Sequence, residues 1–172
     1  MITETRPAPS RPLQPATPPR YGVILFVALL LVAGVALAAR GLRGSGTLSG
    51  GVTLTPLLGD LVSMQVDVGG NVTHLGRSTV RIDAVADFSG AVPQPIPPST
   101  GVITAANGDT LSFLLKWAVT EVAPGVFDVI GPFDVTGGTG RFRSATGSGD
   151  YRGLVDTVSG SVTADISATI AR

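Results

Sequence analysis

Alternation of apolar and polar residues with a period of two is the clearest pattern in this chain, and it predicts β-strands. In VSMQVDV, residues 62–68, the four apolar residues fall on one face of an extended chain and the three polar residues on the other. The stretch SVTADISATI, residues 161–170, alternates in the same way. Each of these segments is therefore expected to form a strand with one buried apolar face and one solvent-exposed polar face.

Turn signals recur along the chain from residue 46 onward, at the short spacing typical of an all-β protein. Asn107-Gly108 predicts a hairpin with a type I′ turn, in which both central residues take a positive φ. Pro124-Gly125 predicts another turn. We expect about eight strands, the last two segments being separate strands or a closing pair. The predicted segments are 46–55, 60–69, 71–76, 78–88, 102–106, 109–122, 126–136, 147–156 and 159–171.

Strands of this kind predict an all-β fold, an eight-stranded antiparallel β-barrel, because closure removes exposed sheet edges. A two-sheet sandwich is the alternative architecture. The segment SGAVPQPIPPSTG, residues 89–101, holds four prolines and is not expected to be a central strand. It is predicted to cross one end of the barrel or to cover its mouth.

The N-terminal part differs in composition from the predicted barrel. Residues 1–20 hold six prolines and are expected to be disordered. Residues 21–39 are uncharged and mainly apolar, and as a helix they would reach about 28 Å, close to the thickness of a bilayer core. This hydrophobic helix is interpreted as a transmembrane anchor or a signal peptide, with a buried core helix as a third reading. Residues 40–45 are expected to be a flexible linker to the barrel domain, 46–172.

Charge and composition limit where in the cell the protein is expected and which kinds of partner and metal site it can have. Arginines flank 21–39 with a slight excess before it, which favours a cytoplasmic N-terminus and an extracytoplasmic barrel, anchored at the cell membrane or secreted. Residues 45–172 carry seven basic and eleven acidic residues, so nucleic acid is not an expected partner. The chain has no cysteine and a single histidine, His74, which excludes thiolate and histidine-rich metal sites. No cofactor, metal or catalytic residue is predicted.

The glycine-rich stretch VTGGTGRFRSATGSG, residues 135–149, could be a phosphate-binding loop or a structural corner. It matches neither glycine-rich phosphate motif, and no helix is expected to follow it. Its glycines permit a tight corner between two strands, with Phe142 turned inward and Arg141 and Arg143 facing solvent. A ligand contact through these arginines is the alternative interpretation.

Three further residues could contact a ligand inside or beside the barrel. Trp117 belongs to an apolar stripe over 111–119 that would be either core or a pocket wall. Tyr151 could place a phenol at the barrel mouth or belong to an ordinary solvated strand. His74 could be a general base or ligand contact, or a structural hydrogen-bonding residue. The candidate ligand-binding residues are His74, Trp117, Arg141, Arg143 and Tyr151.

The stretch GGTGRFRSATG resembles the glycine corner of plant dirigent proteins and, less closely, that of allene oxide cyclases. THLGRST, residues 73–79, and TAANGDTL, residues 104–111, resemble signatures of secreted bacterial proteins with the same barrel. The resemblance implies an eight-stranded barrel and a homotrimer. Dirigent proteins commonly continue with Ala-Arg-Gly, whereas this chain has Ala145-Thr146-Gly147, so their activity is not implied here.

The expected function is that of a non-enzymatic barrel that binds a small apolar ligand or serves a structural role at the envelope. The alternative is a cofactor-independent isomerase or cyclase of the allene oxide cyclase type, acting on a lipid-derived substrate. A third class is a surface module that binds a partner protein. A binder or cyclase needs an open lumen, whereas a purely structural barrel would be filled by its own side chains.

Overall fold

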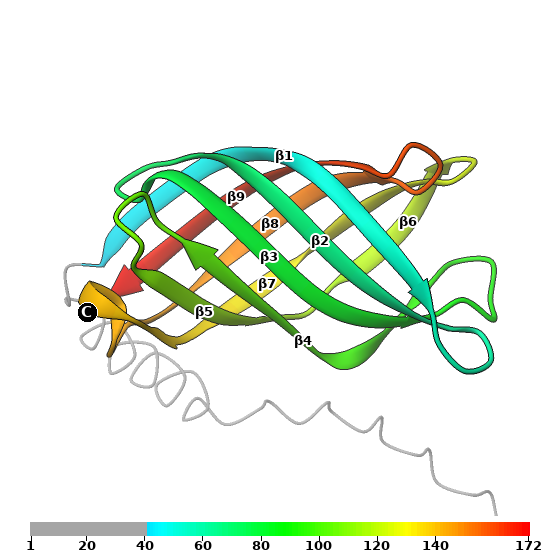
Figure 1. Cartoon of the computed structure of the whole chain (residues 1–172), viewed down its shortest axis with the longest axis horizontal. Coiled ribbons are helices and arrows are strands. Elements are labelled where there is room, and N and C mark those ends of the chain that lie inside the picture. The colour runs from blue at the N-terminus through cyan, green and yellow to red at the C-terminus, as the bar shows by residue number, and fades with distance from the viewer. Residues whose placement is uncertain (1–40) are drawn as a thin grey trace, which may run out of the picture. The chain divides into compact units, whose positions relative to one another are not determined.

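The computed structural model describes residues 41–172, which form an all-β unit (Figure 1). Its strands are β1 (Leu42–Pro56), β2 (Leu61–Val72), β3 (Gly76–Asp87), β4 (Gln94–Thr104), β5 (Thr110–Leu115), β6 (Ala118–Ala123), β7 (Val126–Gly138), β8 (Thr146–Asp156) and β9 (Ser161–Ala171). A short 3-10 helix, η1, covers Gly140–Phe142. Within residues 41–172 no helix is long and apolar enough to span a membrane. The predicted segments 1–20 and 21–39 lie outside the described residues.

The strands close into an antiparallel barrel with eight strand positions. They follow the order β5-β4-β3-β2-β1-β9-β8-β7-β6, and pairing of β5 with β7 closes the circle. Both β5 and β6 pair with β7, through Leu115 with Phe133 and Ala118 with Ile130. They therefore share one position, the predicted strand 109–122, which is interrupted at Lys116 and Trp117. The eight-stranded antiparallel barrel is confirmed, and the two-sheet sandwich is wrong.

The strand β2 is longer than predicted. It runs without a break to Val72, and the chain turns at residues 73–75 before β3 begins at Gly76. The separate strand predicted at 71–76 is therefore wrong. A Cβ at Gly70 would overlap the carbonyl of Thr47 on β1, so this glycine within β2 permits close approach of the two strands.

Part of the proline-rich segment is a barrel strand, which corrects the prediction for residues 89–101. Gln94–Thr104 forms β4 between β3 and β5. The prolines fit because β4 pairs with β5 only from Ser99 onward, which leaves the edge of the preceding residues without a strand partner. Pairing with β3 is also irregular between Asp83 and Val85, opposite the Pro97-Pro98 pair.

Two local predictions change in the structure. Leu42 pairs with Ile170 of β9, so residues 42–45 belong to β1 and not to a flexible linker. The hairpin at Asn107-Gly108 is confirmed, but its type I′ turn is wrong, since Gly108 has a φ of +85° and Asn107 has no positive φ. The Gly108 amide donates to the Ala105 carbonyl over 2.9 Å, as in a type I turn followed by a left-handed glycine.

The apolar faces of the strands point into the barrel, as the alternation predicts. Val68 on β2 and Val162 and Ile170 on β9 are buried, while Asp67 and Thr163 between such positions are exposed. The predicted stripe over 111–119 also faces inward, because Leu111 and Phe113 are buried and Val119 lines the interior. The core is therefore the barrel interior.

Candidate functional site

The barrel encloses an apolar cavity of about 110 Å³, here called the lumen. Every strand contributes inward-facing side chains to its wall, because residues of a strand alternate between the two faces of a sheet. Among the wall residues are Leu48, Met64, Val66, Ile82, Leu115, Val129, Val155 and Ile166. Many of them are only half-buried although they point inward, so side chains do not fill the middle of the barrel.

One end of the barrel is closed by side chains. This closed end carries the turns β2–β3 and β4–β5 and the glycine corner with η1. Phe142 is fully buried, and Leu75, Leu111 and Ala145 are buried beside it in the same core. A void of only about 20 Å³ remains among the apolar residues there. The closed end is therefore a packed plug.

The lumen reaches the opposite end, here called the open end, which carries the turns β1–β2, β3–β4, β6–β7 and β8–β9. Phe88 and Pro93 of the β3–β4 connection and Thr157 of the β8–β9 turn line it there. The part of the proline-rich segment that precedes β4 thus contributes to the barrel mouth, as one reading of the sequence predicted. A small molecule would enter from this end.

Trp117 and Tyr151 are brought together in the lumen wall. The Trp117 indole donates to the Ser99 hydroxyl over 3.0 Å, and the Tyr151 hydroxyl donates to the Lys116 carbonyl over 3.2 Å. Tyr151 reaches this carbonyl across β7, where its register partner is Gly131, a residue without a side chain to obstruct the ring. Residue Trp117 and the Tyr151 hydroxyl therefore both lie at the interruption between β5 and β6.

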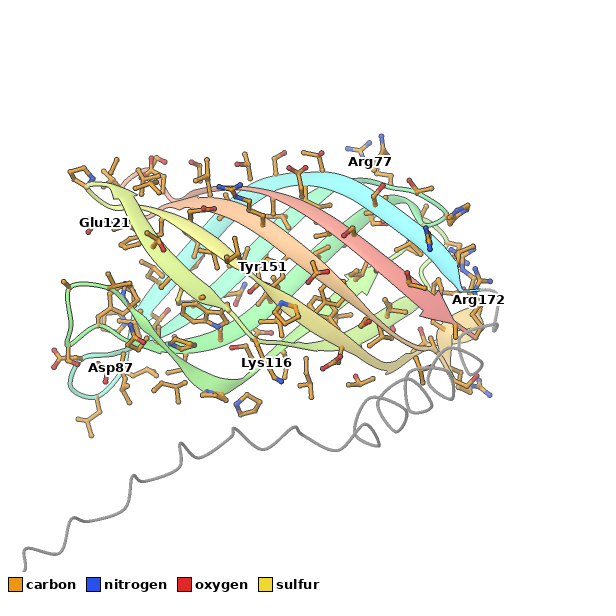
Figure 2. The ribbon with its side chains drawn as sticks, turned by 180° about the vertical axis from the view of Figure 1, so that it is seen from behind. Arg77, Asp87, Lys116, Glu121, Tyr151 and Arg172 are labelled. Atoms are coloured by element: carbon orange, nitrogen blue, oxygen red, sulfur yellow. The ribbon has the colours of Figure 1, made fainter. Side chains whose placement is uncertain are left out.

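The environment of Tyr151 differs from the one predicted. The residue lies at the middle of β8 (Figure 2), so its phenol is in the wall of the lumen and not at the mouth. Burial raises the pKa of this phenol above its ordinary value, because the charged phenolate would lose solvation. Its neighbour Arg152 faces outward and binds Asp128 through two hydrogen bonds of 3.1 and 2.8 Å.

Polar chemistry in the lumen wall is sparse. Apart from Trp117 and Tyr151, the one wall side chain with a hydrogen-bonding nitrogen or oxygen is Thr157. Its hydroxyl donates to the Gly125 carbonyl over 2.9 Å. All three polar side chains of the wall thus direct a hydrogen to a protein acceptor, and the wall offers no charged group.

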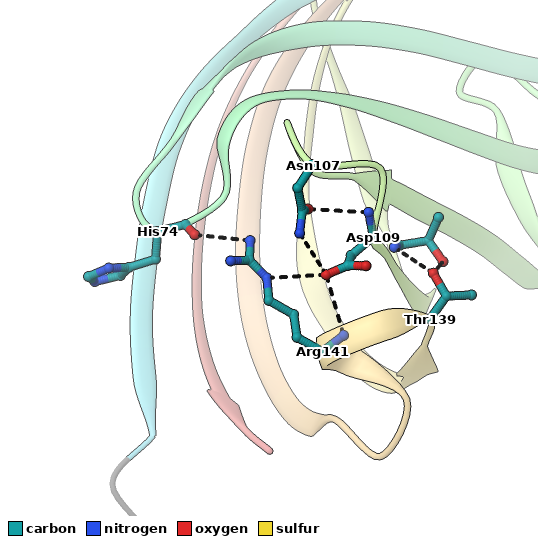
Figure 3. A network of polar contacts seen from close by, with 6 residues as sticks. His74, Asn107, Asp109, Thr139 and Arg141 are labelled. Carbon is teal, nitrogen blue, oxygen red and sulfur yellow. Dashed lines mark hydrogen bonds and ion pairs between the residues drawn. The ribbon is translucent and has the colours of Figure 1, made fainter.

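The other candidate residues lie at the closed end, outside the lumen wall (Figure 3). The His74 side chain is exposed and points away from the polar network, while its backbone carbonyl accepts a 3.3 Å hydrogen bond from Arg141. Arg141 also forms a 3.6 Å ion pair with Asp109. Arg143 is exposed on the same corner. The structure thus separates these residues from Trp117 and Tyr151.

The glycine stretch is a structural corner, as the sequence analysis favoured. Gly137 and Gly140 have φ values of +135° and +53°, and η1 turns the chain between β7 and β8. Phe142 points inward, as predicted, and the Arg141 guanidinium lies 4.8 Å from its ring centroid. The corner closes the barrel and contributes nothing to the lumen wall.

Charge is segregated along the barrel axis, as the labelled residues in Figure 2 show. The acidic residues of the open end are Asp60, Asp87, Glu121 and Asp156. The closed end carries Arg43, Arg77, Arg141, Arg143 and Arg172, and Asp109 lies in its β4–β5 hairpin. The Glu121 carboxylate accepts a 3.1 Å hydrogen bond from the Gly125 amide of the β6–β7 turn, and Glu121 is not among the residues that line the lumen.

Several wall residues were not among the predicted candidates. Phe127, Val129 and Phe133 alternate along β7, and this period was readable in VFDVIGPFDV, residues 126–135. Phe88, Pro93 and Thr157 lie in connections, where no periodicity indicates direction. Within residues 41–172, no group of three or more histidine or acidic side chains is placed to hold a metal ion.

Comparisons of the chain with protein-family models, with curated protein sequences and with solved structures find no match. The class of protein is therefore defined by the fold and the site alone: a closed antiparallel barrel with a plugged end and an apolar lumen.

Proposed function

We propose that this chain is an extracytoplasmic barrel, membrane-anchored or secreted, whose lumen binds a small apolar molecule without transforming it. The observation that carries the proposal is an apolar lumen that reaches one end and is not filled by side chains. A cavity of about 150 Å³ lined by apolar side chains suffices for a molecule such as benzene. At about 110 Å³ this lumen is smaller than that cavity, but it reaches the open end, so a single-ring ligand could extend into the mouth, whereas a drug-sized one would not be enclosed.

The composition of the wall argues for binding and against a reaction. Acid–base catalysis needs a group that exchanges a proton near the working pH. The wall offers the Tyr151 phenol, whose pKa burial raises further from neutrality, and no carboxylate, histidine or lysine. The predicted isomerase or cyclase activity therefore gains no support from a specific residue of the lumen.

The membrane part of the proposal rests on the sequence of residues 21–39, which is uncharged over nineteen positions. This stretch precedes Leu42, the first residue of β1, by two residues. An anchor there would hold the barrel close to a membrane surface, and cleavage of the same stretch would release it.

Fluorescence of Trp117 tests the binding proposal, because this residue is the single tryptophan of the chain and lies in the lumen wall. The full chain is reconstituted in phosphatidylcholine vesicles and titrated with para-bromotoluene, whose bromine quenches indole fluorescence on contact. The expected result is saturable quenching. Linear quenching alone, as from ligand dissolved in the lipid, would contradict the proposal.

Two phenylalanine variants on β9 provide the matched control. Ala164 lines the lumen, so Ala164→Phe places a ring in the ligand space and is expected to abolish saturable quenching. Thr163 is exposed on the outer face, so Thr163→Phe adds the same ring without changing the lumen and should quench like the unaltered chain. Equal quenching in the two variants would place the ligand outside the lumen.

A further inference from the structure

We propose that the closed end of the barrel docks on a membrane that contains anionic lipid, and that arginines at this end bind the lipid headgroups. This surface, here called the arginine face, consists of Arg43, Arg77, Arg141, Arg143 and Arg172. The inference rests on one part of the proposed function, the membrane anchor at residues 21–39, and does not depend on a ligand in the lumen. It assigns the end of the barrel that faces the bilayer.

The positive charge of the arginine face is available to an external anion. All five of its residues are exposed. Arg141 forms an ion pair with Asp109, but the side chains of Arg43, Arg77 and Arg143 form no ion pair within residues 41–172. A guanidinium group presents several N–H donors in a geometry that matches phosphate oxygens. The phosphate of a lipid headgroup supplies those oxygens.

The arginine face is built on the closed barrel and its plug. Its residues come from the start of β1, the start of β3, the glycine corner and the residue that follows β9. The guanidinium groups of Arg141 and Arg172 lie 4.8 and 5.4 Å from the ring centroid of Phe142, which is fully buried. The barrel therefore gathers at one end charges that are up to 129 residues apart in the chain, from Arg43 to Arg172.

The path of the chain argues for a membrane as the occupant of this face. Residues 40 and 41 alone separate the apolar stretch 21–39 from Leu42, where β1 begins at the closed end. An anchor in a bilayer would therefore deliver the chain to the closed end and bring the arginine face near the headgroups. Attraction between basic side chains and anionic lipid acts within about one Debye length, roughly 10 Å at 0.1 M salt.

The opposite charge of the open end supports the same orientation. In Figure 2, Arg77 and Arg172 lie toward one end of the barrel and Asp87 and Glu121 toward the other. No lysine or arginine lies in the turns of the open end, residues 57–60, 88–93, 124–125 and 157–160. Anionic lipid attracts the closed end and repels the open end. Because the lumen reaches the open end, docking leaves its mouth toward water, and a ligand enters from the aqueous phase.

A fluorophore on a single introduced cysteine tests this orientation in the full chain, which has no cysteine of its own. Ala106 is exposed in the β4–β5 hairpin at the closed end, and Leu58 is 91% exposed in the β1–β2 turn at the open end. The strand β5 is four strand positions from β1, so a tether at the start of β1 does not by itself hold this hairpin at the bilayer.

The labelled Ala106→Cys and Leu58→Cys chains are reconstituted in phosphatidylcholine vesicles with and without phosphatidylglycerol. Each bilayer also contains lipid with a nitroxide quencher on its headgroup. We expect phosphatidylglycerol to increase quenching at position 106, and 1 M salt to reverse the increase, because the Debye length then falls to about 3 Å. Position 58 should stay unquenched in both lipids. Equal quenching at position 106 in the two lipids, or stronger quenching at position 58, would overturn the inference.

Two double variants of the Ala106→Cys chain provide the matched control. Arg77→Gln with Arg143→Gln removes two charges from the arginine face, whereas Arg81→Gln with Arg152→Gln removes two exposed charges from the middle of β3 and β8. One arginine near an anionic surface contributes about fivefold to binding. The first pair should therefore lower the ratio of docked to undocked chains about 25-fold, and the second pair less than about twofold. Equal losses would show that net charge and not the arginine face decides docking, and would overturn the inference.

Flotation separates this inference from the proposed function. A chain that floats with phosphatidylcholine vesicles has the proposed anchor, so the absence of a lipid effect at position 106 then overturns the docking alone. A chain that does not float with them contradicts the anchor. In that case, flotation with phosphatidylglycerol vesicles that is lost in Arg77→Gln with Arg143→Gln supports the arginine face, and no flotation with either lipid overturns it. Ligand binding in the lumen, followed by Trp117 fluorescence, enters neither result.

Discussion

Arg141 and Asp109 tie the glycine corner to the β4–β5 hairpin at the closed end of the barrel. The Arg141 side chain lies 3.6 Å from the Asp109 carboxylate, and the backbone amide of Arg141 donates to the same carboxylate over 3.3 Å. Asn107 adds a hydrogen bond of 2.8 Å to it from within the hairpin. Through its bond to the His74 carbonyl, Arg141 also engages the β2–β3 turn. Three turns are therefore joined around one carboxylate.

Replacement of Asp109 by alanine should reduce the free energy of unfolding by about 1–2 kcal/mol, because three donors lose an acceptor in a partly exposed site. Asp134 provides a matched control, since it is exposed on β7 and makes no hydrogen bond or ion pair to another side chain within residues 41–172. Asp134→Ala should change stability by less than about 0.5 kcal/mol. Urea unfolding followed by Trp117 fluorescence measures the stability of both variants. Equal effects would show that the contacts of the Asp109 carboxylate contribute nothing to the free energy of unfolding.

Two glycine substitutions separate backbone strain from steric overlap. Gly108 has a φ of +85° with open space where a Cβ would stand, so Gly108→Ala should cost about 1 kcal/mol for the left-handed conformation alone. Gly140 has a φ of +53°, and its Cβ would overlap the Asp109 carboxylate. We expect Gly140→Ala to cost at least about twice as much. Equal losses in chemical denaturation would mean that the carboxylate moves aside freely.

Much of the barrel could be predicted from the chain because alternation and turn residues are local signals. The faces of β2 and β9, the hairpin at Asn107-Gly108 and the inward turn of Phe142 follow from them directly. The end of β4 was predicted as the segment 102–106, but residues 94–101 could not be predicted as strand, since their tolerance for proline depends on the absence of a neighbouring strand there. Whether a neighbouring strand pairs with this stretch is decided by how the sheet closes and not by the residues of the segment itself.

Packing should make the plug and the lumen wall respond differently when a large side chain is replaced by alanine. Phe142 is fully buried in the plug, so Phe142→Ala should cost about 3–5 kcal/mol through lost contacts and a new cavity. Ile166 borders the lumen and is only half-buried, so Ile166→Ala removes fewer contacts and should cost about 1–2 kcal/mol. Chemical denaturation of the two variants gives the comparison. Similar losses would indicate that the lumen is packed as tightly as the plug.

The candidate site was only partly readable in the sequence. The stripe that contains Trp117 predicts an inward position, but the hydrogen bond from Tyr151 to the Lys116 carbonyl depends on the interruption of the strand at Lys116, which no pattern in the sequence indicates. Arginine residues near glycine suggested ligand contact, yet Arg141 binds Asp109, which is 32 residues away in the chain. Such partners are set by the closure of the barrel, which no local pattern encodes.

Alkaline pH should destabilise the barrel through Tyr151. The fold raises the pKa of this phenol from its ordinary value of 10.0, because burial disfavours the phenolate. Below pH 10 the phenol is protonated in both states, and its contribution to stability is complete. As the pH rises above that value, the unfolded chain loses the proton first, so the free energy of unfolding falls. In Tyr151→Phe this alkaline loss should be reduced.

The titration can be followed directly by ultraviolet absorbance of the phenolate. Tyr21 is the other tyrosine of the chain, so the Tyr21→Phe variant reports Tyr151 alone. We expect no phenolate signal at the ordinary pKa of tyrosine, about 10, and its appearance only together with loss of the folded barrel at higher pH. A reversible titration near that value in the folded protein would mean that solvent reaches the phenol freely. The lumen wall would then not shield Tyr151 from water.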